Sequence, residues 1–253
     1  MYRLYCINQD EENKEKVSEC MYRRVFDKDP RNLWFHRPKK DQCDTCIAYK
    51  NHHGLMSEET RLQFEKHLEN KNTARYIKKC AKEDKDPLKT SCAFDFEQIM
   101  LCPHGQSSKY YYKRRLGVYN LSFYDYTNAD AFCYMWHEGE GNRGANEVAT
   151  CMYKYIENQK INNGKKEINM FSDNCPGQNK NKYVAFAINF FCRHFKLNKL
   201  THTFLEKGHT ETENDAVHAI IERKTRHIYL YTPDQWFAAV KNSKGIKTTL
   251  HCM

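Results

Sequence analysis

Hydrophobic and polar positions divide the chain into a polar first third and a more apolar remainder. Residues 1–40 are polar and charged, and the pattern predicts a helix over residues 11–25. Residues 57–86 are predicted to form one long helix, because Ser57 is a suitable N-cap, Glu58 follows in the first turn and a thin apolar stripe continues. A helix this polar buries little surface, so we expect it to stand out from the core or to pack on a partner.

The pattern changes near residue 90, where strand-like and helical segments begin to follow one another closely. Three strand-like segments rich in Tyr, Phe, Val and Cys are residues 93–101, 110–126 and 131–138. After them the periodicity predicts a helix over 146–159, a strand over 167–172, a helix over 181–195, a strand over 200–205 and a helix over 214–223. Antiparallel strands followed by alternating elements predict a mixed sheet with helices on its faces.

Composition and charge limit the classes of protein to consider. The 253 residues are enough for one large domain or for a core domain with a smaller satellite. No apolar run reaches the roughly 18 residues that a membrane span needs. The 41 Lys and Arg against 32 Asp and Glu give a net charge of +9, which favours a polyanionic partner, although solvated surface lysines explain it as well. The 12 scattered cysteines indicate buried free thiols in a reducing compartment.

Three separated carboxylates stand where a metal site would need them. Asp173 ends a strand-like run and precedes a Pro-Gly turn, Asp95 lies inside another strand-like run, and Asp215 belongs to an acidic group at 211–215. Each alone has an ordinary role, as a strand, turn or helix-start acid. Together, on a strand, a strand end and a helix, they suit two divalent cations that act in phosphoryl transfer.

The third acid and its neighbours leave alternatives open. If residues 214–223 are helical, Asp215, His218 and Glu222 share one face; Asp215 is preferred and Glu222 is the competitor. His209 and His218 are candidates for hydrogen bonds to the ligands or to phosphate. Among the residues that open the helix after Asp173, two further candidates, which simple capping would also explain, are Gln178 and Asn179.

A tight pair of thiols, Cys43 and Cys46, has the spacing of half a structural zinc site. His67 is the preferred third ligand, and His53 or Cys80 would complete the set; His36 and His52 are further candidates. Two ordinary loop thiols are the alternative. A redox pair is disfavoured because no thioredoxin-like strand and helix surround it.

A basic stretch among tyrosines, Lys113, Arg114 and Arg115, is predicted to lie on a strand and to contact a nucleic-acid backbone. A partly buried strand with an exposed basic edge explains the same pattern.

Several segments resemble a family of transposase-derived proteins with a DDE/D ribonuclease-H-like core, known from animal genomes. The segments are residues 35–46, 113–121, 172–179 and 208–218. The order of elements matches that fold, in which one acid lies on the first strand, one at the end of the fourth and one on the helix after the fifth. The resemblance implies a mixed five-stranded sheet with flanking helices over residues 90–240. The expected domains are a helical N-terminal region over 1–89, with the candidate zinc site and the long charged helix, this core, and a tail over 241–253.

By that resemblance the activity is divalent-metal-dependent cleavage and transfer of DNA strands. Two Mg²⁺ or Mn²⁺ ions would be held by Asp95, Asp173 and Asp215, or by Glu222 in place of the last. The sequence departs from the family in having no separate DNA-binding domain before residue 35, so a truncated or domesticated copy is expected. The alternatives are a binding module for DNA or protein that no longer cuts, and a fragment without function. DNA is the expected partner, a homo-oligomer is left open, no membrane is expected, and the chemistry implies a nuclear location.

Overall fold

The computed structural model describes residues 2–28, 43–51, 57–110, 112–243 and 246–251. The chain forms two compact units, Met1–Gln42 and Cys43–Met253. The first contains helices α1 (Tyr2–Glu11) and α2 (Glu19–Asp27). The expectation of one helix over residues 11–25 is therefore wrong. Asn13 takes a positive φ of 50°, and the Ser18 side chain caps a new helix by accepting from the Met21 amide.

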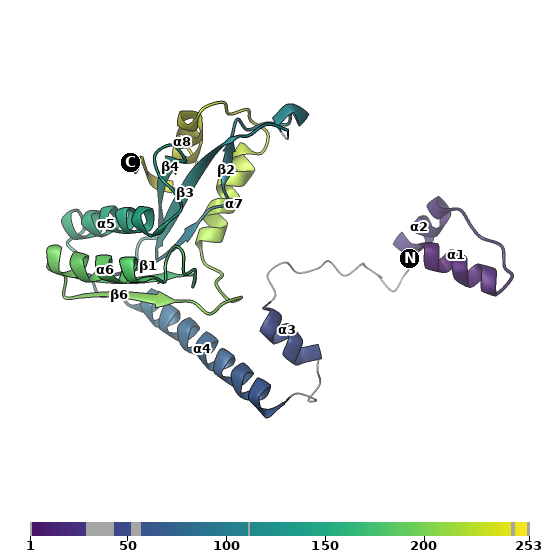
Figure 1. Cartoon of the computed structure of the whole chain (residues 1–253), viewed down its shortest axis with the longest axis horizontal. Helices are drawn as coiled ribbons and strands as arrows, with labels where there is room; N and C mark the ends of the chain where they lie inside the picture. Colours follow the sequence, from purple (N-terminus) through teal and green to yellow (C-terminus); the bar gives the residue numbers. More distant parts are fainter. Residues whose placement is uncertain (1, 29–42, 52–56, 111, 244–245, 252–253) are drawn as a thin grey trace. The chain divides into compact units, whose positions relative to one another are not determined.

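The second unit carries the remaining elements (Figure 1). They are, in order, α3 (Asp44–Asn51), α4 (Glu58–Glu83), β1 (Lys89–Phe96), β2 (Met100–Cys102), the short 3₁₀ helix η1 (Ser108–Tyr110), β3 (Leu116–Asp125), β4 (Asp130–His137), α5 (Ala145–Ile161), β5 (Glu167–Ser172), α6 (Lys182–His194), β6 (Lys199–Phe204), α7 (Asn214–Thr225), α8 (Pro233–Lys241) and β7 (Ile246–His251). The boundaries expected at residues 89 and 240 stay a prediction.

The strands form one sheet in the order β6-β5-β1-β3-β4-β7, with β2 paired to β3. β3 runs antiparallel to β1 and β4, whereas β5 and β6 run parallel to β1. If β2 and β7 are left out, the other strands lie in the order β4-β3-β1-β5-β6, which is 3-2-1-4-5 when they are numbered along the chain. This is the ribonuclease-H-like arrangement, and it confirms the expected fold class. β7 adds a parallel strand beyond β4, so over the described residues the sheet is wider than the five strands expected, and the region expected to be a tail contributes to it.

Two expected strands are shorter in the structure. The segment 93–101 is divided, because β1 ends at Phe96 and the separate β2 begins at Met100. β3 begins only at Leu116, so the expectation that the preceding basic residues lie on a strand is wrong. β2 ends at Cys102, and the next residue is Pro103, which has no N–H with which to extend the ladder towards the start of β3.

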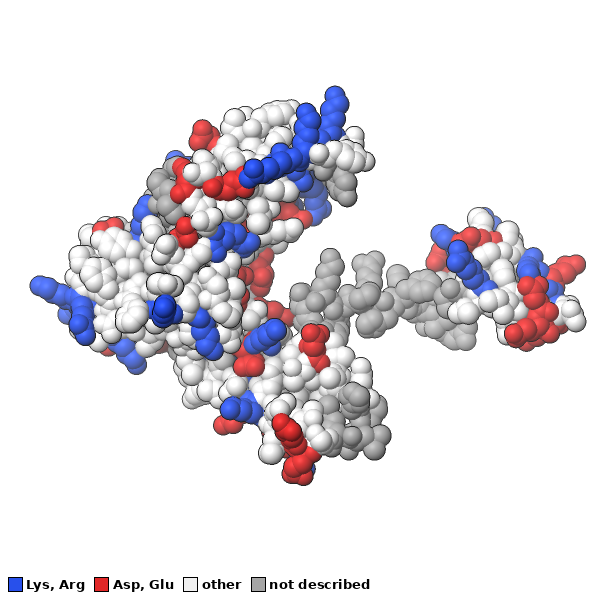
Figure 2. Space-filling model, viewed as in Figure 1, with Lys and Arg blue, Asp and Glu red and all other residues white. Residues whose placement is uncertain are grey.

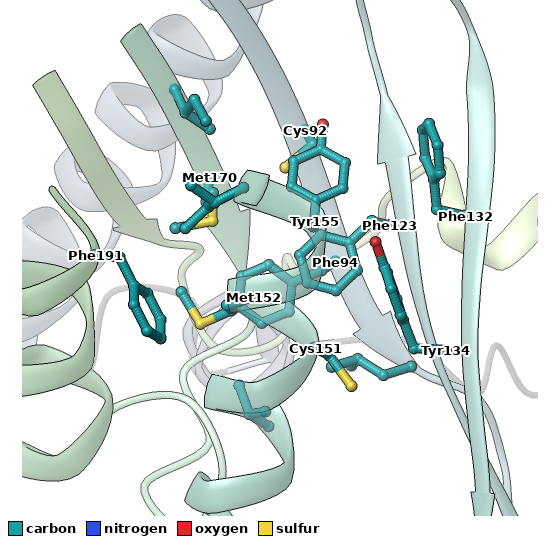
Figure 3. Close-up of a cluster of buried hydrophobic side chains, with 14 of the residues drawn as sticks. Cys92, Phe94, Phe123, Phe132, Tyr134, Cys151, Met152, Tyr155, Met170 and Phe191 are labelled. Carbon is teal, nitrogen blue, oxygen red and sulfur yellow. The ribbon is translucent and has the colours of Figure 1, made fainter. Parts of the chain in front are cut away.

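One face of the sheet packs under α5 and α6 and holds the largest apolar cluster. Alternate residues of β1, Cys92 and Phe94, point into it and are fully buried. Figure 3 shows them among aromatic and sulfur-containing side chains from β3, β4, β5 and α5. The Phe123 ring stacks on that of Tyr155 with a centroid separation of 4.8 Å. This layer fixes which side of β1 faces away from the core.

The end of β3 is fastened by a buried carboxylate, Asp125. Its Oδ2 accepts hydrogen bonds from the Thr90 hydroxyl at 3.1 Å, the Tyr155 hydroxyl at 3.0 Å and the Gln159 amide at 2.8 Å. Oδ1 accepts from the Thr127 amide at 2.8 Å. The carboxylate therefore joins β1, β3 and α5 with its acceptor sites filled.

The opposite face of the sheet carries α4, α7 and α8. Val217 and Ile221 of α7 pack with Trp236 of α8 against β3 and β4. Ala74 of α4 packs with Ala93 and Phe171. Among the described helices, none combines the length and apolar character that crossing a membrane requires.

Candidate functional site

The strand register brings two of the predicted acids to the same face of the sheet. β1 and β5 are parallel, and Ala93 is the Cα partner of Phe171. Both side chains lie on the α4 face, so residues two positions further along, Asp95 and Asp173, also point to that face. Asp173 directly follows the last residue of β5, so the side chain is held by a strand end.

The first turn of α7 brings the third acid to β1. The ligand atoms of Asp95, Asp215 and His218 all lie within 4.8 Å of one another. The Thr212 amide donates to Oδ2 of Asp215 at 2.9 Å and holds its carboxylate at the helix start. This group consists of a strand acid, a helix acid and an imidazole one turn further on.

His218 is fixed from the sheet side by Ser122, the cross-strand partner of Asp95. The Ser122 hydroxyl lies 2.7 Å from Nε2 of His218 and donates to Oδ1 of the buried Asn214 at 2.9 Å. Burial lowers the pKa of His218 to about 4, so the imidazole is neutral at physiological pH. A neutral imidazole keeps one nitrogen with a free lone pair, which can bind a cation or accept a proton.

The electrostatics of Asp95 are those of a carboxylate that lacks a counter-charge. Burial and, to a smaller extent, the charges of Asp173 and Asp215 together raise the pKa of Asp95 to about 7, against the opposing effects of the Phe96 amide and Arg143. Three carboxylates this close repel one another unless a cation or a proton lies between them. The shift therefore marks a place where a divalent cation would be bound favourably.

Asp173 is near Asp95 but lies outside the group within 4.8 Å. Its Oδ1 accepts a hydrogen bond from the side-chain amide of Asn179, which is 3 % exposed. Asn179 thus positions a carboxylate, whereas the sequence suggested contact with phosphate. Gln178 lies in the same turn before α6, and its role stays a prediction.

Glu222, the alternative third acid, is further along α7. It also lies outside the group within 4.8 Å. Its side chain is 73 % exposed, and its carboxylate is 3.6 Å from the guanidinium of Arg226. The geometry therefore favours Asp215 as the helix acid next to Asp95.

A cleft of about 580 Å³ opens beside these residues and contains an acid that the sequence analysis did not single out. Glu97 lines the cleft with Asp95 and Asp215 and is 7 % exposed. Burial and, to a smaller extent, the charge of Glu222 together raise the pKa of Glu97 to about 7, although the Asn120 amide lowers it by donating to the carboxylate at 2.8 Å. Glu97 directly follows the last residue of β1, and no local sequence pattern marked it as a buried acid.

The predicted basic residues lie at the mouth of this cleft and in the loop before β3. Arg115 lines the cleft. Arg114 is 89 % exposed and 3.3 Å from the Glu138 carboxylate, and Lys113 is in the same loop. Figure 2 shows Lys and Arg side chains gathered at the tip that carries η1, with Asp and Glu side chains in the notch below.

A second cluster of ligating side chains lies at the start of α3. The ligand atoms of Cys43, Cys46, His67 and His209 are all within 4.8 Å of one another. The first three were expected together, but the expectation that His209 supports the carboxylates is wrong. Cys80 lies outside the cluster and is exposed, and His36, His52 and His53 lie outside the described residues.

Comparisons with known proteins give a family model and a distant structural similarity. The family model "Domain of unknown function (DUF7869)" matches residues 122–252. No curated protein matches the chain. Among solved structures the chain is similar to the "Mos1 transposase paired-end complex with left transposon end", with 10 % identity, a TM-score of 0.36, and coverage of 98 % of this chain and 94 % of that chain. Because the family model spans more than half of the sequence and includes Asp173 and Asp215, the chain belongs to the DUF7869 family.

Proposed function

We propose that this chain is a transposase-like enzyme that cuts and transfers DNA strands with the help of divalent cations. One observation carries the proposal: the ligand atoms of Asp95, Asp215 and His218 lie within 4.8 Å of one another on the face of a ribonuclease-H-like sheet that carries α4 and α7. Asp173 ends the neighbouring strand and raises the pKa of Asp95. A carboxylate on the first strand, one after the fourth and one on the helix after the fifth supply the oxygen-rich donor set that Mg²⁺ and Mn²⁺ prefer.

The residues of the chain have separable roles in this proposal. Asp95 and Asp215 would hold a divalent cation between them, and Asp173, whose Oδ1 accepts from the Asn179 amide, would offer its other carboxylate oxygen to a second ion. Bound divalent cations activate the attacking water or hydroxyl and stabilise the leaving oxygen of the phosphodiester. Asn179 orients Asp173, and Ser122 keeps His218 in place beside the acids.

A nucleic-acid substrate follows from the charges around the cleft. Acids at its floor would repel a phosphodiester unless cations were bound, whereas Arg115 at its mouth attracts the phosphate backbone. Lys113 and Arg114, in the exposed loop next to Arg115, extend this attraction. DNA is the proposed partner, with a nuclear location as its consequence.

The decisive experiment compares the full chain with Asp95→Asn on supercoiled plasmid and on labelled duplex DNA. We expect nicking that requires Mg²⁺ or Mn²⁺, that disappears with a chelator, and that falls by at least about 100-fold in Asp95→Asn. Asp234→Asn, which changes an exposed helix-start acid in α8, serves as the matched control and should cut normally. Cleavage that persists in Asp95→Asn would remove the basis of the proposal.

A DNA-binding module that no longer cuts is the second candidate. One observation favours it: Asp173 lies outside the group formed by Asp95, Asp215 and His218, whose ligand atoms are within 4.8 Å of one another. This reading predicts DNA binding that is indifferent to chelator and to Asp95→Asn, with no strand cleavage at any divalent-metal concentration.

A further inference from the structure

The Cys43, Cys46, His67 and His209 cluster draws its members from three separate parts of the second unit. The two cysteines flank the start of α3, His67 lies in α4, and His209 lies in the loop between β6 and α7. Figure 1 shows the turn after β6 approaching α3. More than 160 residues of sequence separate Cys46 from His209, so this convergence is a property of the fold and not of local spacing.

The distances within the cluster are those of ligands around one ion. Nε2 of His67 lies 3.4 Å from Sγ of Cys43 and 3.5 Å from Sγ of Cys46, and Nε2 of His209 lies 3.4 Å from Sγ of Cys46. A tetrahedral Zn²⁺ with Zn–S near 2.3 Å and Zn–N near 2.0 to 2.1 Å requires an S···N separation of about 3.5 Å. A single nitrogen has one proton or one lone pair, so its equal approach to two sulfurs is better explained by a shared centre.

Two neighbouring residues, Glu206 and Gly208, hold these side chains in the state and position that metal binding requires. Nδ1 of His67 is 3.0 Å from Oε1 of Glu206, which fixes the proton on Nδ1 and leaves the Nε2 lone pair facing the sulfurs. Gly208 has φ +78°, and a Cβ there would lie 2.8 Å from the Cβ of Cys43. Only glycine allows the β6–α7 loop to approach Cys43 this closely and to deliver His209.

We propose that this cluster binds one structural Zn²⁺ and that the ion fastens the β6–α7 loop, which leads to Asp215, onto α3 and α4. All four coordination positions are filled by protein atoms, which is the pattern of a structural and not a catalytic zinc site. The binding of Zn²⁺ is independent of the proposed enzymatic function, whereas the importance of placing Asp215 rests on that function.

A second attachment between α4 and the same loop explains how zinc binding would affect the position of Asp215. Nζ of Lys78 donates to the Glu211 carbonyl at 3.0 Å and lies 3.4 Å from the Glu213 carboxylate, to which Lys82 also binds. Glu213 is the N-cap residue of α7, two positions before Asp215. The ion at His209 would therefore hold the middle of the loop, and the lysines at Glu213 hold its end at α7.

The test is the metal content of the full-length protein, purified without chelator from zinc-supplemented medium. We expect one zinc ion per chain, with Co²⁺ substitution giving the visible bands of a tetrahedral site and sulfur-to-cobalt charge transfer. Cys46→Ser and His209→Asn should lose the zinc. The matched controls, Cys80→Ser and His194→Asn, change an exposed cysteine of α4 and an exposed histidine of α6 and should keep it.

His209→Cys keeps the assignment falsifiable if loss of a ligand prevents folding. Cysteine is a zinc ligand, so this variant should retain the ion and gain charge-transfer intensity in its cobalt form. A wild-type chain without zinc, or cobalt spectra unchanged by His209→Cys, would overturn the site. No step requires DNA or Mg²⁺, so failure to cut DNA leaves the result unaffected.

Hydrogen exchange tests the effect on the loop. Removing zinc with a zinc-selective chelator should accelerate exchange across residues 205–213 by at least about tenfold, while α5 on the opposite face stays protected. Unchanged exchange in this loop would overturn the proposed link to Asp215 and leave the zinc content as a separate result.

Discussion

The side-chain amide of Asn179 donates a hydrogen bond to Oδ1 of Asp173. This contact decides the orientation of the carboxylate that ends β5. Because Asn179 is buried, the amide has no competing partner in water. The orientation of Asp173 is therefore set by the turn that follows it and not by β5 alone.

Replacing this amide should impair cleavage without weakening DNA binding. We expect Asn179→Ala to lower the rate of cleavage about 10- to 100-fold, as loss of a partner that orients a metal-ligating carboxylate commonly does. Single-turnover cleavage at saturating Mn²⁺, together with DNA affinity, measures the effect. Asn174→Ala in the same turn is the control. Faster cleavage in Asn179→Ala would instead show that the amide withholds Asp173 from the cations.

Stability at acid pH should depend on His202. The imidazole lies 2.8 Å from the Ser172 hydroxyl and packs near Phe94 and Phe204, and burial lowers its pKa to about 4. From about pH 6.5 down to about 4 the unfolded chain therefore binds more protons than the folded chain, and stability falls as the pH falls. The loss attributable to this group is up to about 3 kcal/mol near pH 4.

His202→Asn should flatten the acid side of the stability profile measured by urea unfolding between pH 7 and pH 4.5. Burial also lowers the pKa of His218 to about 4, so the variant removes only part of the dependence. His194→Asn, at an exposed position of α6, should leave the profile unchanged. Parallel profiles for wild type and His202→Asn would contradict the assignment.

The buried carboxylate at the end of β3 should be a large contributor to folding. Asp125→Ala leaves the donors of Thr90, Tyr155 and Gln159 without their acceptor, and each buried unsatisfied group costs about 1–3 kcal/mol. We expect the free energy of unfolding to fall by at least about 3 kcal/mol, measured by denaturant titration. Asp234→Ala, at an exposed acid, should change it by less than about 1 kcal/mol. A comparable loss in both variants would contradict the role of this network.

The cleft arginine should control affinity for DNA across all sequences. Arg115→Ala removes a cation at the mouth of the cleft, so binding should weaken uniformly and the slope of log K against log salt should decrease in magnitude by about one. Fluorescence anisotropy with unrelated duplexes at several salt concentrations measures both quantities. Arg193→Ala on α6, across the sheet, provides the comparison. Equal salt slopes for Arg115→Ala and the wild type would exclude backbone contact at this position.

Local patterns of apolar residues predicted most of the second unit, because its helices are amphipathic and central strands such as β1 and β4 are apolar and buried over most of their length. α5, β5, α6, β6 and α7 lie within a few residues of their expected ranges. The exceptions depend on pairing that a sequence does not display. β3 passes from pairing with β1, whose last residue is Phe96, to pairing with β2, whose Cys102 is opposite Leu116, and among the described residues no strand pairs with the basic loop that precedes β3. The N-terminal helix was misjudged because Ser18 could equally lie inside a polar helix or cap a new one.

The candidate site residues also fall into those that a local sequence pattern could indicate and those that depend on contacts between distant parts of the chain. Asp95, Asp173 and Asp215 could be singled out because each is a polar residue at a defined place in an apolar pattern. His209 was assigned to the wrong group because its neighbours in space are Cys46 and His67, far away in sequence. Glu97 was passed over because nothing in a one-dimensional pattern distinguishes a buried acid from a solvated one.

The alternation of β1 has a consequence for mutational tolerance. Phe94 fills the layer under α5 while Asp95 faces the cleft, so a slip of one residue would bury the acid and expose the phenylalanine. A variant that lets β1 shift in register therefore loses folding stability, whatever its effect on activity. Selection for a stable chain alone would therefore preserve the orientation of Asp95 towards the cleft. This face of the sheet is a stable scaffold on which the cleft can be redesigned.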